Sequence, residues 1–274
     1  MLSADVSREI GNERLFGFKK VGQPSYKSPT IPSNDIDAAA TFSRGMAAWQ
    51  RNEKTEGQRL FSVAAAAGYP DAMLELGVIA DRRGDARTAD ARFREAAAAG
   101  HSGGMFNLGL AAEKQGNFTE ATRWYEKAAA MGHTQALTNL GNHADMSGDS
   151  AGALVWYTKA AEAGDVNAMH NLGMTYGQLN QEVLALEWLT RAANAGVFEA
   201  MAELGLRSYR EGNIGLCIEW WVGAANAGSV DAMVNLGKLF EMQSQPETAQ
   251  DWFRKAAAAG DSEAALRVRM PGNS

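Results

Sequence analysis

The chain has 274 residues, of which 46% are hydrophobic, and a formal net charge of −6 at pH 7. This length allows a substantial core. The acidic balance argues against a nucleic-acid surface, which needs clustered Lys and Arg, and no apolar run approaches the roughly 20 residues of a membrane-spanning helix. The single cysteine, Cys217, excludes an internal disulfide, so we expect a cytoplasmic protein.

Residues 1–34 show no internal repeat. They contain Pro24, Pro29 and Pro32 and the aromatic and basic stretch Leu15-Phe16-Gly17-Phe18-Lys19-Lys20. This composition is typical of an extended or disordered arm. Such an arm could bind a second partner, fold back on the rest of the chain or serve as a plain linker, and the sequence does not choose among the three.

Residues 35–270 repeat with a period of 32 residues. One glycine follows an Ala-rich run, a second lies within a predicted helix, and a tryptophan is followed by another large residue. The members are Gly68, Gly100, Gly132, Gly164, Gly196, Gly228 and Gly260; Gly77, Gly109, Gly141, Gly173, Gly205 and Gly237; and Trp124, Trp156, Trp188, Trp220 and Trp252, followed by Tyr125, Tyr157, Leu189, Trp221 and Phe253. A period of this length indicates a solenoid of stacked supersecondary units.

Each unit is predicted to be a helical hairpin. Glycine after the Ala-rich run can take the left-handed conformation that ends a helix, and N-cap residues such as Asp165 and Asp85 follow. A glycine inside a helix costs roughly 1 kcal/mol relative to Ala, so we expect the aromatic ring of the second helix to compensate by packing on the bare backbone. The pattern predicts an all-α solenoid of about seven helix-turn-helix repeats, a C-terminal capping helix up to Met270, and a tail at 271–274.

At these residues the sequence resembles the Sel1-like branch of the tetratricopeptide repeat superfamily. The motifs are A-x-x-x-L-G, as in Ala136 to Gly141, and W-Y-x-K-A-A, as in Trp124 to Ala129, and the resemblance spans roughly residues 37 to 270. The turn Gln115-Gly116-Asn117-Phe118 is shorter than the loop usual in Sel1-like repeats and resembles an ordinary tetratricopeptide turn. The resemblance implies an adaptor that assembles complexes or binds a peptide segment of a partner.

The first helix of each unit should line a concave groove with the face opposite its packing Leu and Gly. Thr138 and Val234 are among the residues assigned to this face. The face carries nine acids and four bases, which favours a neutral to basic partner. The alternative is that these charges form only a solvated surface. An amide can donate to and accept from a peptide backbone, and the resemblance implies that the asparagines hold the ligand, with a scaffold preference as the alternative. The predicted partner-binding residues are Glu75, Phe106, Asn107, Asn139, Asn142, His170, Asn171, Met174, Glu203 and Asn235.

Other candidate chemistry has a structural explanation. We expect the tryptophans and the once-per-unit methionines to pack in the core, and Cys217, which stands where other units have Ala, to be buried. His101 and His133 lie one repeat apart, too far to share a tetrahedral ion, and we expect them to cap helices or face solvent.

No pattern of a catalytic triad, paired acids or a phosphate-binding loop is present. We therefore predict a non-catalytic protein without a metal or cofactor, acting as a protein-binding scaffold. The alternative is a regulatory sensor that binds a small molecule or short peptide in a deep central pocket around His170, Asn171 and Met174.

Overall fold

The structure is a computed structural model that describes residues 37–269. The predicted N-terminal arm (1–34) and C-terminal tail (271–274) lie outside the described residues, so the division of the chain into these parts stays a prediction.

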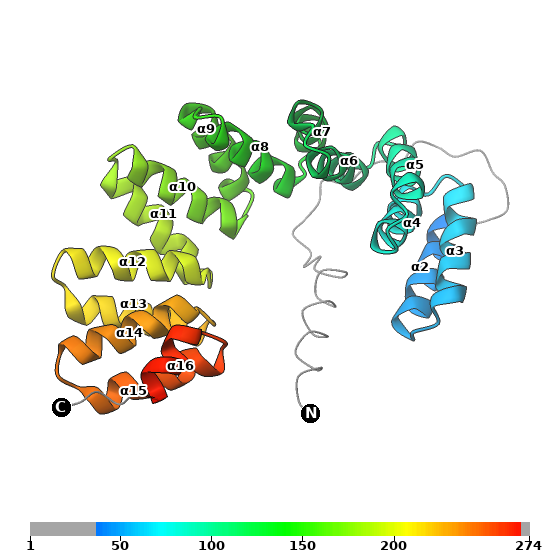
Figure 1. Cartoon of the computed structure of the whole chain (residues 1–274). Coiled ribbons are helices and arrows are strands. Elements are labelled where there is room, and N and C mark those ends of the chain that lie inside the picture. Colours follow the sequence, from blue (N-terminus) through cyan, green and yellow to red (C-terminus); the bar gives the residue numbers. More distant parts are fainter. Residues whose placement is uncertain (1–36, 270–274) are drawn as a thin grey trace.

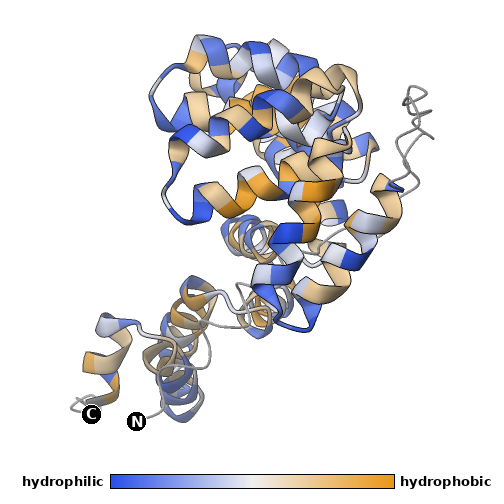
Figure 2. Cartoon of the chain, turned by 90° about the vertical axis from the view of Figure 1, so that its right-hand side faces the viewer, coloured by the Kyte–Doolittle hydropathy of each residue, from blue (hydrophilic) through white to orange (hydrophobic). Residues whose placement is uncertain are grey.

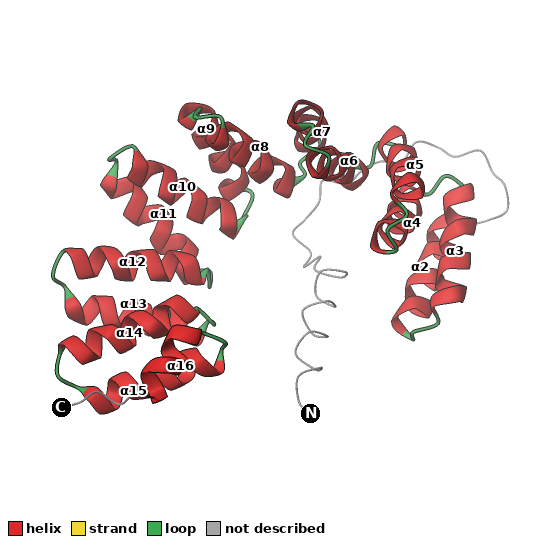
Figure 3. Cartoon of the chain, in the orientation of Figure 1, coloured by secondary structure: helices red, strands yellow, loops and turns green. Residues whose placement is uncertain are grey.

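Fifteen helices make up most of residues 37–269, and no strand occurs there (Figure 3). They are α2 (Ala38–Gln50), α3 (Lys54–Ala66), α4 (Pro70–Arg82), α5 (Ala86–Ala98), α6 (Ser102–Lys114), α7 (Phe118–Ala130), α8 (Thr134–Met146), α9 (Ser150–Glu162), α10 (Val166–Gln178), α11 (Glu182–Asn194), α12 (Phe198–Arg210), α13 (Ile214–Asn226), α14 (Val230–Met242), α15 (Pro246–Ala258) and α16 (Ser262–Arg269).

These helices form seven hairpins, from α2/α3 to α14/α15, followed by the unpaired α16. Each helix packs mainly against the helices that precede and follow it in the chain. The stack curves into an open arch, and the first helices α4, α6 and α8 lie on its inner side while α5, α7 and α9 lie outside (Figure 1). The predicted all-α solenoid with a capping helix is confirmed.

The turns between helices depend on residues with positive φ. All seven glycines that follow the Ala-rich runs have positive φ, and so do four glycines within the hairpins. The other three hairpins place Asn52, Asn180 and Ser244 there, with φ of 64°, 57° and 58°. The predicted N-caps also form, since Asp165 accepts from the backbone N–H of Asn167 at 2.9 Å. The turns within the hairpins, such as Arg83-Gly84-Asp85, are rich in hydrophilic residues, whereas links between hairpins such as Ala195-Gly196-Val197 are not. Figure 2 shows the hydropathy along the chain.

The glycines inside the first helices lie directly beneath large side chains of the second helices. A Cβ on Gly77 would lie 2.5 Å from the ring of Phe93, and one on Gly237 would lie 2.6 Å from that of Phe253. In one unit the covering residue is aliphatic, with Leu189 Cγ 2.8 Å from a Cβ on Gly173. The predicted close approach is confirmed, and it explains why these helices retain glycine.

The covering residue, rather than the tryptophan before it, forms the centre of the core. Tyr125, Leu189 and Phe253 are 0% exposed, whereas the tryptophans are partly exposed and pack at the boundaries between units. Several carry a cation from the next turn over the ring, as where Lys127 Nζ lies 4.1 Å from the ring centroid of Trp124.

Cys217 is 0% exposed, as predicted. The once-per-unit methionines are partly buried against the core clusters. Within the described residues, no helix is both long enough and apolar enough to cross a bilayer.

Candidate peptide-binding groove

We call the repeated asparagines of the first helices α6, α8, α10 and α14 the asparagine ladder, with members Asn107, Asn139, Asn171 and Asn235. Its two central members, Asn139 and Asn171, contact tyrosines from the preceding hairpins. Tyr157 donates its hydroxyl to Asn142 Oδ1 at 2.8 Å, and Asn171 Nδ2 donates to the same oxygen at 3.1 Å. This arrangement joins α8, α9 and α10 through one acceptor atom. We call Asn142, Tyr157 and Asn171 the amide–tyrosine cluster.

A related contact occurs one unit earlier. Tyr125 donates its hydroxyl to Glu113 Oε2 at 2.5 Å and also hydrogen-bonds the side chain of Asn139. Burial, reinforced by the Glu113 hydrogen bond, raises the pKa of Tyr125, and burial raises the pKa of Tyr157 to about 12. Both hydroxyls therefore stay protonated at neutral pH and act as donors.

The ladder changes where the covering residue has no hydroxyl. Phe93 occupies that position one unit before Asn107, and Asn107 Nδ2 instead donates to Gly103 O of its own helix at 2.8 Å. Trp221 precedes Asn235 in the same way, and its indole N–H donates to Ala202 O at 3.1 Å. Among Asn107, Asn139, Asn171 and Asn235, only Asn139 and Asn171 thus contact a tyrosine.

Tyr125 and Tyr157 were absent from the partner-binding residues predicted from sequence. The W-Y dipeptide marked them as core residues, and their rings are indeed buried. What the pattern did not reveal is that the hydroxyl reaches past the glycine to the polar groups of the first helices. The available signal was the presence of Tyr in two central units where the others have Phe, Leu or Trp.

Phe106 and His133 form a stacked pair, with ring centroids 4.5 Å apart and an interplanar angle of 19°. His133 occupies the N-cap position of α8 but makes no side-chain cap, and its Nδ1 is buried without a hydrogen-bond partner among the described residues. Burial lowers the pKa of His133 to about 4. The expected capping or solvent role is therefore wrong for His133, whereas His101 does cap, accepting from Gly103 N at 3.1 Å.

Two residues assigned to the groove face are instead buried. Thr138 is 8% exposed and donates its hydroxyl to Asp165 Oδ2 at 3.0 Å, and Val234 is also 8% exposed. The start of the next hairpin covers Thr138, whereas α15 and α16 cover Val234, and helical spacing within one helix cannot show either contact.

The acids of the groove face differ in whether they are paired. Glu203 accepts from Arg207 Nε at 2.9 Å, and Asp71 lies 3.2 Å from His101 Nε2. Glu75 is partly buried and has no ion-pair partner in residues 37–269, and burial raises the pKa of its carboxyl. An unpaired, partly buried carboxylate is the kind of group that an incoming cation would stabilise.

His170 and Met174 lie next to the amide–tyrosine cluster on α10. His170 is partly buried and hydrogen-bonds the side chain of Asn171, while burial lowers its pKa. Met174 packs against the cluster that contains Leu189 and Leu204. Both residues are only partly buried, and their role in partner binding stays a prediction.

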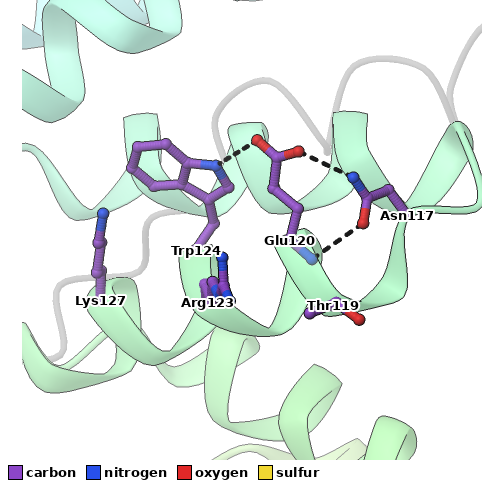
Figure 4. A pocket seen from close by; sticks show the side chains of 6 residues that line it. All are labelled: Asn117, Thr119, Glu120, Arg123, Trp124 and Lys127. Atoms are coloured by element: carbon purple, nitrogen blue, oxygen red, sulfur yellow. Dashed lines mark hydrogen bonds between the residues drawn. The ribbon is translucent and has the colours of Figure 1, made fainter.

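Two shallow hollows of the described residues lie away from this surface. One, of about 310 Å³, is lined by the exposed side of α7 (Figure 4), where Trp124 Nε1 donates to Glu120 Oε1 at 3.4 Å and Asn117 caps the helix. The other has the same volume and lies along α3 near Arg83. Neither includes a predicted partner-binding residue. No group of three or more potential metal ligands comes together in residues 37–269.

Two family models match the chain in succession. The tetratricopeptide repeat model matches residues 74–133 and 106–168, and the Sel1 repeat model matches residues 166–197, 198–229 and 230–261. The chain is a Sel1-like repeat protein of the tetratricopeptide repeat superfamily.

Solved structures of Sel1 and tetratricopeptide proteins resemble this Sel1-like repeat protein. A Sel1 repeat protein from Oxalobacter formigenes is 25% identical with a TM-score of 0.68, covering 80% of this chain and 99% of that one. PilF of Pseudomonas aeruginosa is 17% identical with a TM-score of 0.57, covering 74% of this chain and 97% of that one. A tetratricopeptide repeat protein from Parabacteroides merdae is 14% identical with a TM-score of 0.52, covering 85% of this chain and 98% of that one. The last two show the fold alone. A comparison with curated proteins finds no match.

Repeats of these two families generally serve as scaffolds for protein–protein interaction and are typically non-catalytic. For this Sel1-like repeat protein, the family therefore indicates the class of function.

Proposed function

We propose that this chain is a non-catalytic scaffold that binds an extended, neutral to basic segment of a partner protein along the inner surface of α4 to α14. The amide–tyrosine cluster is the observation that carries the proposal. It holds the side-chain amides of Asn142 and Asn171 in fixed orientations, because Asn142 Oδ1 accepts hydrogen bonds from both the Tyr157 hydroxyl and Asn171 Nδ2.

Asn142 keeps its Nδ2 group without a hydrogen bond to any described residue, and the amide is only partly exposed. A peptide backbone offers alternating C=O and N–H groups, which oriented amides can bind without selecting a side chain. Ordering these amides in advance reduces the entropy lost on binding. The cluster therefore suits recognition of an extended backbone.

Charge supplies the preference for a neutral to basic segment. Glu75 lacks an ion-pair partner among the described residues, and so does the exposed Asp145 on α8. A cationic side chain at either acid would be attracted at long range and would help steer association. Cytoplasmic location remains part of this proposal, since the lone Cys217 forms no disulfide.

The alternative of a small-molecule sensor has no comparable support. It calls for a deep pocket around His170, Asn171 and Met174, whereas the two hollows described above lie at α3 and α7.

The test begins with identification of the partner by affinity capture and mass spectrometry, followed by titration of the purified partner. Asn139→Ala with Asn171→Ala should weaken binding roughly thirty-fold, since each of the two lost hydrogen bonds contributes about 1 kcal/mol net. Asn194→Ala with Asn226→Ala is the matched control, because these amides are exposed at the ends of α11 and α13. If both double variants bind the partner as the wild type does, the inner surface is not the binding site.

A further inference from the structure

The chain contains a segment with the chemistry that the inner surface favours. Within Arg14–Lys27 there are four cationic residues, namely Arg14, Lys19, Lys20 and Lys27, and no acid. The same segment carries Phe16, Phe18 and Tyr26. It lies outside the described residues, and the linear distance in sequence from Lys20 to the start of α2 is short.

We propose that Arg14–Lys27 binds the inner surface of α4, α6 and α8 of its own chain and competes there with the partner. The inference rests on the proposed function, since it assigns an internal ligand to the same groove. The segment is thereby a regulator of access rather than a second binding arm.

The N-terminal half of the inner surface lies nearest to this segment along the chain and offers two acids without an ion-pair partner. Glu75 and Asp145 have no ion-pair partner in residues 37–269. On the C-terminal side, Glu203 is paired with Arg207 at 2.9 Å and Glu241 with Arg267 at 2.8 Å, while Glu199 and Asp231 have no ion-pair partner in residues 37–269. Unpaired acids therefore occur in both halves, and the short tether favours α4 to α8, which the segment reaches first along the stack.

Apolar groups accompany these free acids. Val78 on α4 and Leu110 on α6 occupy the position that Asn142 holds on α8, one repeat apart, and both are only partly buried. At this position the surface of α4 and α6 is therefore apolar, whereas α8 presents the amide of Asn142. Phe16 and Phe18, beside Lys19 and Lys20, match a surface on which apolar groups adjoin Glu75.

The tether allows this contact. Lys20 precedes Asp37 by 17 residues, and an extended chain spans at most about 3.6 Å per residue, or roughly 60 Å in total. Packed helices lie about 8–10 Å apart, so α4 and α6 are within reach. A tether of this kind gives an effective concentration on the order of millimolar, which makes even a weak segment a competent competitor.

Zero-length carbodiimide cross-linking of the full chain tests the contact, because it joins only amines and carboxylates in direct ionic contact. We expect mass spectrometry of the monomer fraction to find Lys19 or Lys20 joined to Glu75 or Asp145. The matched control is Glu126, an exposed acid of α7. Links to Glu126 at equal yield, or links confined to covalent dimers, would overturn the proposal.

A charge-reversal series gives an independent readout. Lys19→Glu with Lys20→Glu, in the full chain, should abolish the links and let a fluorescent synthetic Arg14–Lys27 peptide bind at least about five-fold more tightly, because the internal competitor is removed. Adding Glu75→Lys and Asp145→Lys to that variant should weaken binding of the synthetic peptide again, because the charge-reversed arm can then bind the charge-reversed inner surface and compete. Circular dichroism verifies that each variant stays helical.

The outcomes separate the two proposals. If the peptide binds wild type and the arm variant equally, or binds neither, the arm is not the internal ligand and the present inference fails. The partner titration with the Asn139 and Asn171 variants is unaffected by that result. If instead the peptide competes but the partner ignores those asparagine substitutions, the inner surface holds only the arm and the proposed function fails.

Discussion

The ring of Tyr157 covers the backbone of Gly141 so closely that a Cβ at Gly141 would overlap the ring carbons Cδ1 and Cε1. The same tyrosine is 2% exposed and donates its hydroxyl to Asn142 at 2.8 Å. One side chain therefore packs a hairpin together and, at its tip, orients an amide of the groove.

Gly141→Ala should destabilise the protein by about 1–3 kcal/mol, because the added methyl overpacks a ring that its hydrogen bond holds in place. Gly215→Ala is the control: this helical glycine is exposed, with no heavy atom within 4 Å of a Cβ there. It should be neutral or stabilising by up to about 1 kcal/mol. Urea denaturation measures both, and equal stabilities for the two variants would refute the packing argument.

Ser244→Gly should stabilise the protein by roughly 1 kcal/mol. Ser244 has φ of 58°, where most other hairpin turns have glycine, and an L-residue in this conformation costs about 1–2 kcal/mol, part of which the more flexible unfolded glycine offsets. Ser244→Ala, which keeps the Cβ, should give no gain. The comparison is made by thermal melting, and a rise in Tm for Ala equal to that for Gly would exclude the backbone explanation.

Stability should fall as the pH drops from about 6.5 toward 4, partly because of His133. Its pKa is lowered from 6.5 to about 4, so in this window the unfolded chain binds the extra proton and the folded chain does not. His133→Phe keeps the stack on Phe106 and should lose less stability between pH 6.5 and 5. An NMR titration of the His133 ring supplies the direct check, and a midpoint near 6.5 would contradict the burial effect.

Cys217 should react slowly with a thiol reagent in the folded protein and rapidly in denaturant. Its side chain is 0% exposed, and burial raises the pKa of the thiol to about 11, which suppresses the reactive thiolate. Absorbance of the released chromophore follows the rate. Similar rates with and without denaturant would show that the thiol is accessible.

Glu75→Lys should slow association with a basic partner, and the difference from wild type should shrink as salt rises. Glu126→Lys makes the same change of charge on the outer helix α7, where it should have less effect. Stopped-flow association rates at low and high ionic strength provide the measurement. A uniform slowing by both substitutions would indicate that net charge alone, not the groove, steers the partner.

The repeat architecture could be predicted from the sequence because each set of residues that recurs every 32 positions meets a conformational or packing requirement within one hairpin. Gly100 follows an Ala-rich run because a helix ends there with positive φ, as the value of 79° shows. Gly77 and Phe93 recur together because one must be small for the other to pack. These requirements lie within one hairpin, so a 32-residue period expresses them directly.

The inner surface was predictable only in part, because it depends on contacts between hairpins. Helical spacing places Asn139 and Asn171 on one face, but it does not show that Tyr125 and Tyr157 reach them from neighbouring helices. It also assigned Thr138 to the groove, whereas the next hairpin buries it against Asp165.

The sequence by itself therefore determined the helices, their caps and the stacking order, since each follows from conformational preference and close packing within about 32 residues. Only the tertiary structure decided which polar groups face the inner surface, which are paired and which are buried. The relative rotation of neighbouring hairpins sets the distances between their side chains. That rotation results from many packing contacts between hairpins, which the sequence pattern of a single repeat does not reveal.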